Sequence, residues 1–432
     1  SIARAPRFMT AARAFARTKP IIAFKAGRFP ESAQVAASHT GALASEDAVY
    51  DAAFQRIGLA RVYHLANIFD CVQLIGRNRI PTGPNLGIVT NAGGPGVIAA
   101  DALIAAKGSL ARLSDDTLAQ LNAALPSSWS HGNPVDILGD ATSKRLEKAA
   151  QIVLADPAVE ALLVILTPQA MTNVTAAARV VGKLAESTAK PVLAAWLGGA
   201  SMREGMQILT ESGVATYRTP EQAVGAFMTL VDYGRNLQTL YETPKDLPVE
   251  FELDRARLRA DFVARHCGPH PILSEAVSKD LLEGYGIPTA RPRPAADADE
   301  AVRIAGELGY PVVIKILSPD ITHKTDVGGV ALGLEDDAMV RSAFAHMMLA
   351  VGEKAPRARI EGVTVQPMID PRDSLEMILG IKKDATFGTV MMAGMGWVAA
   401  ELLGDRSLGF PPLNERLARR MLESLKIWPL LQ

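Results

Sequence analysis

The most reactive candidate in this sequence is His39, which lies among small residues in the segment SHTGALA (38–44). The segment follows an expected strand, 20–27, and precedes an expected helix that begins at about Glu46. Neutral imidazole is a competent nucleophile toward phosphorus, and a helix start offers unpaired N–H groups to an anion. The pattern is consistent with a phosphorylatable histidine, but a loop histidine that caps backbone groups fits the local sequence at least as well. The neighbours that would contact the phosphoryl group are Ser38, Thr40 and Gly41.

A second candidate is the glycine-rich segment NAGGPG (91–96), which directly follows one expected strand and directly precedes a helix. Glycines let the backbone approach a phosphate closely, and the helix start points at it. The G-x-G-x-x-G spacing of dinucleotide sites is absent, and a tight turn that needs positive φ is the alternative. The segment HGNPVD (131–136) could line the same site or form only a turn. The phosphate-binding candidates here are Asn91, Gly93, Gly94 and Gly96.

A third candidate is Lys315, at the expected end of the strand YPVVIK (310–315). The loop SPDITHKTDVGGV (318–330) follows it and carries His323 and two glycines, Gly328 and Gly329. A lysine beside a glycine loop can clamp a phosphate, whereas a lysine at a strand edge commonly only extends its amine to water. Further on, Gln366 and Met368 end another expected strand. They would form an adenine-facing hinge or a simple edge-strand exit.

Secondary-structure elements must position these loops. The pattern of apolar residues predicts two kinds of domain. Up to residue 236, short apolar strands alternate with helical segments, which indicates α/β structure with parallel sheets buried on both faces. After a polar linker at 241–272, helices stand beside strands that mostly follow one another, which indicates an α+β domain. The strands expected in the first part are 20–27, 86–93, 159–166 and 190–198. In the second part we expect helices at 274–286 and 297–308, and strands at 310–317, 360–369, 374–381 and 387–393.

Composition limits the function classes. A chain of 432 residues is too long for one ordinary core and predicts two or three domains. The net charge of -1 argues against a nucleic-acid partner held by bulk charge, and no apolar run reaches the roughly 18 residues that cross a bilayer. The two cysteines, Cys71 and Cys267, suggest neither a disulfide framework nor a metal cluster, so we expect the cytoplasm. The Arg-rich stretch 1–20 is better explained by an amphipathic helix than by a targeting peptide.

Together the motifs are more specific than any one of them. The order KAGR, SHTGALA, VTNAGGPGV, HGNPVDILGDA, GYPVVIKILSPDITHKTDVGGV and VQPMI closely resembles the NDP-forming (ADP-forming) acyl-CoA synthetases, relatives of succinyl-CoA synthetase. The resemblance covers nearly the whole chain. It implies flavodoxin-like parallel-sheet domains followed by an α+β ATP-grasp domain. The implied divisions are part of a first flavodoxin-like domain (1–80), a second one (81–240), a linker (241–272) and an incomplete ATP-grasp domain (273–432).

The resemblance also implies an activity. Members convert a carboxylic acid, ATP and coenzyme A to acyl-CoA, ADP and phosphate through an acyl phosphate and a phosphohistidine. His39 then matches the histidine beside the acyl-CoA site, His323 a second phosphate carrier, and Glu401 a carboxylate on the Mg²⁺ side. The implied acid is acetate, propionate or an aryl acid such as ferulate, and a homo-oligomer is possible by analogy. The implied nucleotide-binding residues are Lys315, Gly328, Gly329, Gln366, Met368 and Glu376.

Some features depart from the family. Its N-terminal CoA-binding domain is missing here, and the family continues past Gln432, so we expect a fragment that does not complete the reaction alone. Trp397 stands where the family usually has glycine and could narrow the nucleotide site. An alternative function is the acyl-CoA-sensing regulatory part of a lysine acetyltransferase, because the phrases WSHGNPVDILGDA and DRSLGFPPLN resemble such fused members.

Overall fold

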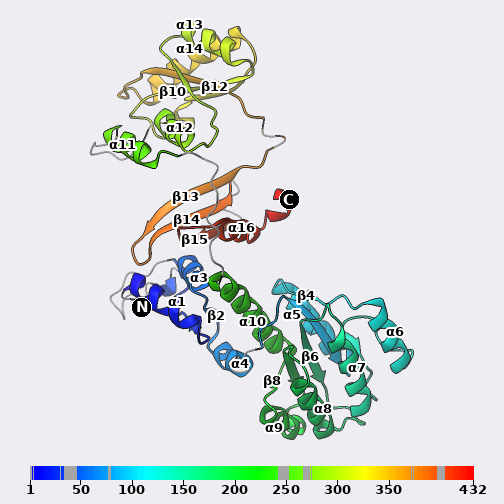
Figure 1. Ribbon diagram of the computed structural model, residues 1–432. Helices are drawn as coiled ribbons and strands as arrows, with labels where there is room; N and C mark the ends of the chain where they lie inside the picture. The colour runs from blue at the N-terminus through cyan, green and yellow to red at the C-terminus, as the bar shows by residue number, and fades with distance from the viewer. Residues whose placement is uncertain are drawn as a thin grey trace. The chain divides into compact units, whose positions relative to one another are not determined.

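The computed structural model divides the chain into two compact units, each described here by itself. The first comprises Ser1–Lys245 and Met377–Gln432, and the second comprises Asp246–Glu376 (Figure 1). The residues described are all except 1, 3, 30, 34–45, 76–78, 242–252, 266–272, 274, 371, 373 and 397–403.

The N-terminal part of the first unit carries a two-stranded parallel sheet. It pairs β1 with β2, with Ile22 opposite Ala60. The first helix buries small residues on one side and leaves its arginines exposed, as expected for an amphipathic helix. The strand β1 is shorter than expected because Gly27 adopts a φ of 69°, which turns the chain. The elements are α1 (Ala5–Ala16), β1 (Ile22–Phe24), α3 (Asp47–Arg56), β2 (Ala60–Val62) and α4 (Leu65–Ile75).

A larger parallel sheet follows. Its strand order is β4-β3-β6-β7-β8, with β5 paired to β3, and every pair is parallel. The strands are β3 (Asn85–Thr90), β4 (Ser109–Leu110), β5 (Val135–Asp136), β6 (Ala161–Leu166), β7 (Val192–Trp196) and β8 (Ala215–Tyr217). The helices are α5 (Gly93–Ala105), α6 (Asp115–Ala124), α7 (Ser143–Ala155), α8 (Val174–Glu186), α9 (Arg203–Glu211) and α10 (Pro220–Tyr241), with a 3-10 turn at Gly199–Met202.

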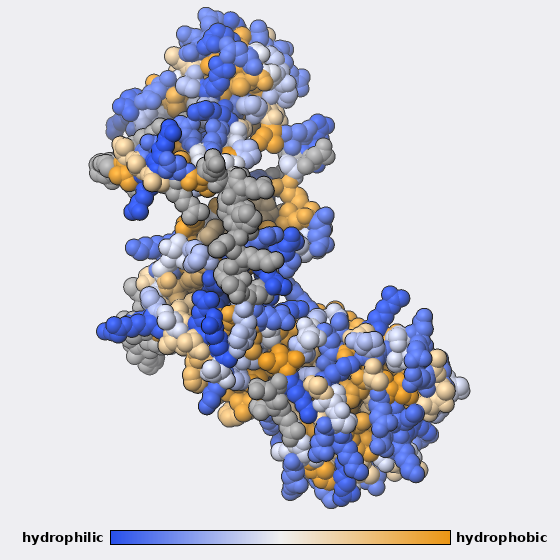
Figure 2. Space-filling model, viewed as in Figure 1, coloured by the Kyte–Doolittle hydropathy of each residue, from blue (hydrophilic) through white to orange (hydrophobic). Residues whose placement is uncertain are grey.

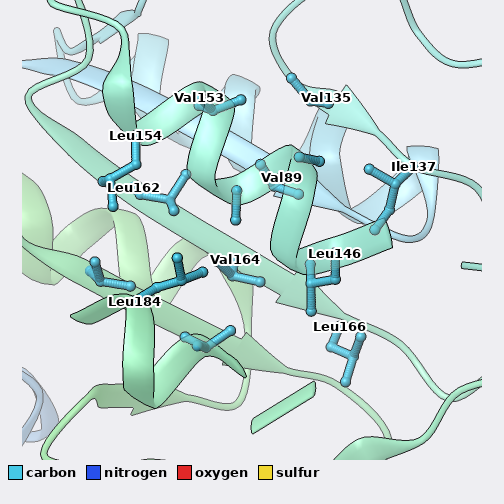
Figure 3. Close-up of a cluster of buried hydrophobic side chains, with 14 of the residues drawn as sticks. Val89, Val135, Ile137, Leu146, Val153, Leu154, Leu162, Val164, Leu166 and Leu184 are labelled. Atoms are coloured by element: carbon cyan, nitrogen blue, oxygen red, sulfur yellow. The ribbon is translucent and has the colours of Figure 1, made fainter. Parts of the chain in front are cut away.

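Both faces of this sheet are buried, which explains why its strands are continuously apolar. Along β6, Leu162, Val164 and Leu166 pack with α7 and α8 on one side (Figure 3). The alternating residues Leu163 and Ile165 pack with α4, α5 and α10 on the other. The α/β, parallel-sheet prediction for this part of the chain is confirmed.

The first unit also contains an antiparallel sheet from the C-terminal part of the chain. Its strands are β13 (Met377–Asp384), β14 (Gly388–Met395) and β15 (Arg406–Gly409), followed by α16 (Glu415–Glu423) and α17 (Trp428–Leu431). The ring of Phe387, between β13 and β14, packs edge-on against Tyr50 of α3 with 5.0 Å between centroids. The sequence grouped these strands with residues 273–376, and that division remains a prediction.

The second unit is α+β, as expected. Its antiparallel sheet has the order β11-β10-β12-β9, and α13 and α14 pack against it around a core that includes Ile304, Ile314 and Val351 (Figure 1). The elements are α11 (Arg255–Arg265), α12 (Glu275–Gly284), β9 (Arg293–Ala295), α13 (Ala298–Leu308), β10 (Val312–Leu317), β11 (Val330–Leu334), α14 (Asp337–Lys354) and β12 (Gly362–Pro367), with a 3-10 turn at Thr325–Val327.

The surface has mixed polarity. Figure 2 shows hydrophilic residues over most of the visible face, with hydrophobic residues in smaller groups between them. Such scattered apolar residues are ordinary on a protein surface. Among the helices that the structure describes, none is both long and apolar enough to cross a membrane.

Candidate functional site

The start of α5 lies where the sequence places it, directly after β3. Its glycines, Gly93, Gly94 and Gly96, are helical and have no positive φ, so the tight-turn alternative is wrong. Gly96 instead permits close packing, because a Cβ there would lie 3.2 Å from side-chain atoms of Thr90 and Pro134. Around Gly94 a Cβ would meet nothing within 4 Å, which leaves open space at the helix start.

Asn91 joins the ends of two neighbouring strands. It is only 2% exposed, and its Oδ1 accepts hydrogen bonds from the backbone N of Thr167 at 2.8 Å and from Oγ1 at 3.1 Å. Its Nδ2 donates to the Thr167 carbonyl at 2.9 Å. The side-chain amide therefore fixes the loops after β3 and β6, which sets the direction in which α5 begins.

A carboxylate stands beside this helix start. Asp136 Oδ2 lies 3.2 Å from the position that a Cβ on Gly93 would take, while Oδ1 accepts from the backbone N of Leu138 at 2.9 Å. The segment 131–136 thus reaches the same site through Asp136. His131 does not contribute, since its ring nitrogens pair with Asn122 Oδ1 at 3.0 Å and the Ser127 carbonyl at 2.9 Å.

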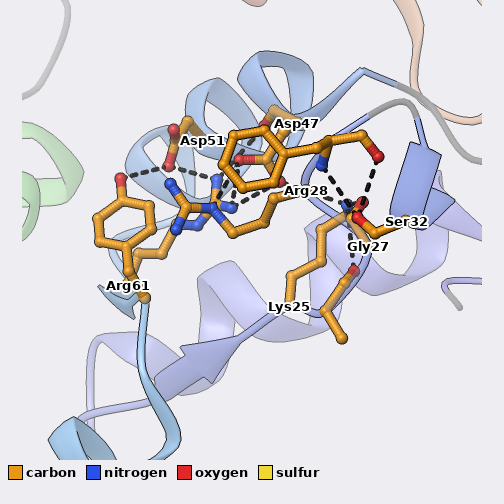
Figure 4. A network of polar contacts seen from close by, with 10 residues as sticks. Lys25, Gly27, Arg28, Ser32, Asp47, Asp51 and Arg61 are labelled. Carbon is orange, nitrogen blue, oxygen red and sulfur yellow. Dashed lines mark hydrogen bonds and ion pairs between the residues drawn. The ribbon is translucent and has the colours of Figure 1, made fainter.

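The histidine segment itself, with Ser38, His39, Thr40 and Gly41, lies outside the described residues. Its flanks are described, and a polar network joins them (Figure 4). Asp47, the first residue of α3, accepts from Lys25 Nζ at 3.3 Å and from Arg28 Nε at 3.5 Å. Because Lys25 and Arg28 precede the segment and Asp47 follows it, this carboxylate ties its two ends together.

Arg61 of β2 also belongs to this network and binds both of its carboxylates. Its Nη2 donates to both carboxylate oxygens of Asp47, at 2.7 and 2.8 Å, and its Nη1 pairs with Asp51 at 2.5 Å. The arginine side chain is only 7% exposed. Burial raises the pKa of Asp47, but the hydrogen bonds and charges of Arg61 and Lys25 outweigh it, and the pKa lies below its ordinary value. The carboxylate is therefore ionised at neutral pH.

The network carries a surplus of positive charge, because three cations, Lys25, Arg28 and Arg61, face two carboxylates. Burial raises the pKa of Asp51, although Arg61 opposes that shift. Sequence reasoning missed the roles of Asp47 and Arg61. The motif KAGR (25–28), which contains Lys25 and Arg28, was the one part of this network that the sequence analysis named.

In the second unit, Lys315 lies inside β10 and not at its end. The ladder with β12 continues to Leu317, opposite Gly362, because Ile316 is buried in the core. Since β10 lies between β11 and β12, the edge-lysine alternative is wrong as well. The Nζ of Lys315 donates to Glu275 Oε1 of α12 at 2.8 Å.

The structure brings the glycine loop next to Lys315. Lys315 pairs with Val330, which directly follows Gly329. Gly328 has a φ of 76°, and a Cβ on Gly329 would lie 2.5 Å from Ile316 Cγ2, so local conformation and packing explain both glycines. His323 of the same loop is exposed.

The remaining nucleotide candidates are spread along the chain. Gln366 is buried in β12, an inner strand, so the edge-strand alternative is wrong, and its Oε1 accepts from Lys279 Nζ at 3.3 Å. The backbone N of Met368 donates to the Pro311 carbonyl at 3.1 Å, and Glu376 is exposed. Glu401 and Trp397 lie outside the described residues.

Comparisons with known proteins match three consecutive domain families. These are the succinyl-CoA ligase-like flavodoxin domain (residues 1–75), the ligase-CoA domain (86–240) and the ATP-grasp domain (267–432). The ADP-forming acetate–CoA ligase I of Archaeoglobus fulgidus is 38% identical over 427 residues, which cover 99% of this chain and 60% of that protein. The β-subunit of the ADP-forming acetate–CoA ligase I of Pyrococcus furiosus is 34% identical over 41% of this chain and 76% of the subunit.

This chain belongs to the ADP-forming acyl-CoA synthetase family. A solved relative is the acetyl-coenzyme A synthetase 1 of Ca. Korarchaeum cryptofilum in complex with phosphate and ADP. It has 30% identity and a TM-score of 0.52 over 56% of this chain and 52% of that chain. The chain spans about three fifths of the length of the Archaeoglobus relative, 60%.

Members of this synthetase family use ATP, which enzymes bind with Mg²⁺. Among the described residues, no group of three or more histidine, cysteine, aspartate or glutamate side chains is placed to hold a metal ion. Glu401, the carboxylate considered for this role, lies outside the described residues. We therefore derive no step through a protein-bound metal and treat Mg²⁺ as part of the nucleotide substrate.

Glu275 predicts a pH dependence of the stability of the second unit. Burial raises its pKa, but hydrogen bonds and charges of Lys315 and Lys279 lower it more, to below its ordinary value of 4.5. A carboxyl with a lower pKa in the folded state stabilises the protein above the unfolded-state pKa, and this contribution is lost as pH falls through the folded-state pKa. We expect the thermal midpoint of the second unit to fall below about pH 4.5, and less steeply in Glu275→Gln. Parallel profiles in calorimetry would contradict this.

Proposed function

We propose that the full-length protein is an ADP-forming acid–CoA ligase. It converts a carboxylic acid, ATP and coenzyme A to acyl-CoA, ADP and phosphate. Family membership along nearly the whole chain, with 38% identity to an acetate–CoA ligase, is the observation that carries the proposal. The regulatory alternative gains no support from the relatives described above, which are named as ligases or synthetases.

The proposed route has four transfers, each of which balances. An imidazole nitrogen of His323 attacks the γ-phosphorus of ATP, and ADP leaves. An imidazole nitrogen of His39 then takes the phosphoryl group, and His323 is released as free imidazole. A carboxylate oxygen of the acid then takes the phosphoryl group from His39 and forms an acyl phosphate. The thiolate of coenzyme A attacks the acyl carbon, and phosphate leaves. In this scheme His323 carries the phosphoryl group between the nucleotide and His39.

Residues of the first unit would hold the phosphoryl group during these steps. Phosphoryl transfer depends on positioning and on neutralising charge more than on covalent chemistry by the protein. The open helix start at Gly94 offers backbone N–H groups, and Asn91 fixes its direction. The network around Asp47 joins the described residues on the two sides of the segment that carries His39, and it holds three cations against two carboxylates. Ser38, Thr40 and Gly41 would complete the contacts.

Residues of the second unit would hold the nucleotide. Lys315 and the loop of Gly328 and Gly329 would face the phosphates, while Gln366 and Met368 would lie near the adenine. Glu376 would also line the nucleotide site, and Glu401 is proposed for the Mg²⁺ side. We propose a cytoplasmic protein whose partners are small molecules, with a homo-oligomer as its possible assembly. Its acid is acetate or propionate first, and an aryl acid such as ferulate second.

Labelling tests the proposal directly. Full-length protein incubated with ATP labelled at the γ-phosphorus should acquire a label that is stable to alkali and labile to acid, the behaviour of a phosphoramidate. Peptide mapping should find it on His39 or His323. Absence of the label, or a label stable to acid, would contradict the proposal. A screen of carboxylic acids that follows loss of free CoA thiol then identifies the acid.

A further inference from the structure

One carboxylate oxygen in the second unit holds two ammonium groups. Glu275 Oε1 accepts from Lys315 Nζ at 2.8 Å and from Lys279 Nζ at 2.9 Å. All three side chains are largely shielded, with exposures of 26% for Glu275, 22% for Lys315 and 19% for Lys279. The two lysines come from different elements, β10 and α12, and both ammonium groups meet at this one carboxylate oxygen.

The bonding of the two lysines differs. Lys279 also donates to the Ala290 carbonyl at 2.7 Å and to Gln366 Oε1 at 3.3 Å, so its three protons have acceptors. For Lys315, Glu275 is the side-chain acceptor found within the described part of the chain. If Lys315 is to bind a nucleotide phosphate, its ammonium group must first leave the Glu275 carboxylate.

Glu275 Oε1 occupies the position that a nucleotide phosphate oxygen would take between the two lysines. A phosphate oxygen bound by two lysines would be a single anionic oxygen accepting from two ammonium groups, and Glu275 Oε1 has that role here. Two ammonium groups held together without an anion would repel each other, since like charges at short range destabilise a partly buried site. The carboxylate removes that repulsion while the site is empty.

We propose that Glu275 is a positioning residue that competes with the nucleotide: it holds Lys315 and Lys279 together in the empty site, and a phosphate oxygen of ADP or ATP displaces it. This inference rests on the proposed function, because it takes Lys315 as the phosphate-binding lysine. It predicts that nucleotide affinity is lower than the two lysines alone would give. Part of the binding free energy is used to break the two ion pairs.

The test is calorimetric titration of ADP into the full-length protein carrying Glu275→Gln. Glutamine keeps the shape of the side chain and removes its charge. We expect ADP to bind about fivefold more tightly, because the variant removes the carboxylate that pairs with both lysines and partly exposed ion pairs contribute on this order. Adenosine, which has no phosphate, should bind wild type and variant equally.

The matched control is Glu283→Gln. Glu283 lies on the same helix and also has partners, Thr289 Oγ1 at 2.5 Å and Arg291 at 3.8 Å, but it does not touch the lysines. ADP affinity should be unchanged in this variant. Glu275→Asp provides a second variant in case the glutamine variant does not fold. It keeps the negative charge but shortens the side chain by one methylene, so ADP should bind more tightly than to wild type, by a smaller factor than in Glu275→Gln.

Two outcomes are decisive against the inference. If wild type binds ADP and Glu275→Gln binds it equally or more weakly, Glu275 is not displaced and the competition does not exist. If wild type does not bind ADP at all, the proposed function fails first and the inference falls with it. The wild-type titration thus separates the two failures.

Discussion

Replacing His39 by asparagine should lower turnover from acid, ATP and CoA by at least about a thousandfold, as removal of a nucleophile does in other enzymes. Asparagine has a similar size and polarity but cannot form a phosphoramidate. The measurement is the steady-state formation of acyl-CoA by the full-length protein. The expected loss is in kcat, because the missing step follows substrate binding.

The same variant separates the two halves of the reaction. Conversion of acyl phosphate and CoA to acyl-CoA and phosphate does not pass through His39 in the proposed route, so it should continue. His64→Asn is the matched control, since His64 is an exposed histidine in the same unit and has no proposed role. Full turnover in the His39 variant, or equal losses in both half-reactions, would contradict the assignment.

The parts predicted correctly from sequence are those with a periodic or contiguous signal. β3, β6 and β7 are unbroken apolar runs because both of their faces are buried, so their positions were predicted to within a few residues. The start of α5 was equally predictable, since strand, glycines and helix follow one another directly. The strand that carries Lys315 was expected at 310–317 and ends at Leu317, but the sequence placed Lys315 at the strand end, whereas it lies inside β10, before the core residue Ile316.

The parts that sequence did not predict are pairings between distant charges. Glu275 and Lys315 lie 40 residues apart, and Asp47 meets Lys25 across 22 residues. Such pairs have no periodicity, and each member taken alone resembles an ordinary charged surface residue. The sequence therefore pointed to the residues proposed to bind phosphate but not to the carboxylates that pair with the cations. Those carboxylates require the folded backbone to be recognised.

Replacing Asp47 by alanine should destabilise the first unit by about 3 kcal/mol, the lower range for removing one member of a buried ion pair. The large effect is expected because the carboxylate has three cationic partners. Arg61 is 7% exposed and Lys25 12%, so neither can recover full hydration when the carboxylate is lost. In the variant, Arg61 would still pair with Asp51, but Lys25 and Arg28 would lose the carboxylate that they share. Urea denaturation followed by circular dichroism measures the change.

Asp140→Ala is the control for this comparison. Asp140 pairs with Arg145 at 2.6 Å, but its side chain is 64% exposed, so its loss should destabilise the protein much less than the loss of Asp47. Asp47→Asn should fall between the two, because the amide keeps one acceptor for Arg61 but no charge for Lys25. Equal denaturation midpoints for Asp47→Ala and Asp140→Ala would mean that the network is no more stabilising than an exposed pair. It would then be unable to fix the two ends of the His39 segment.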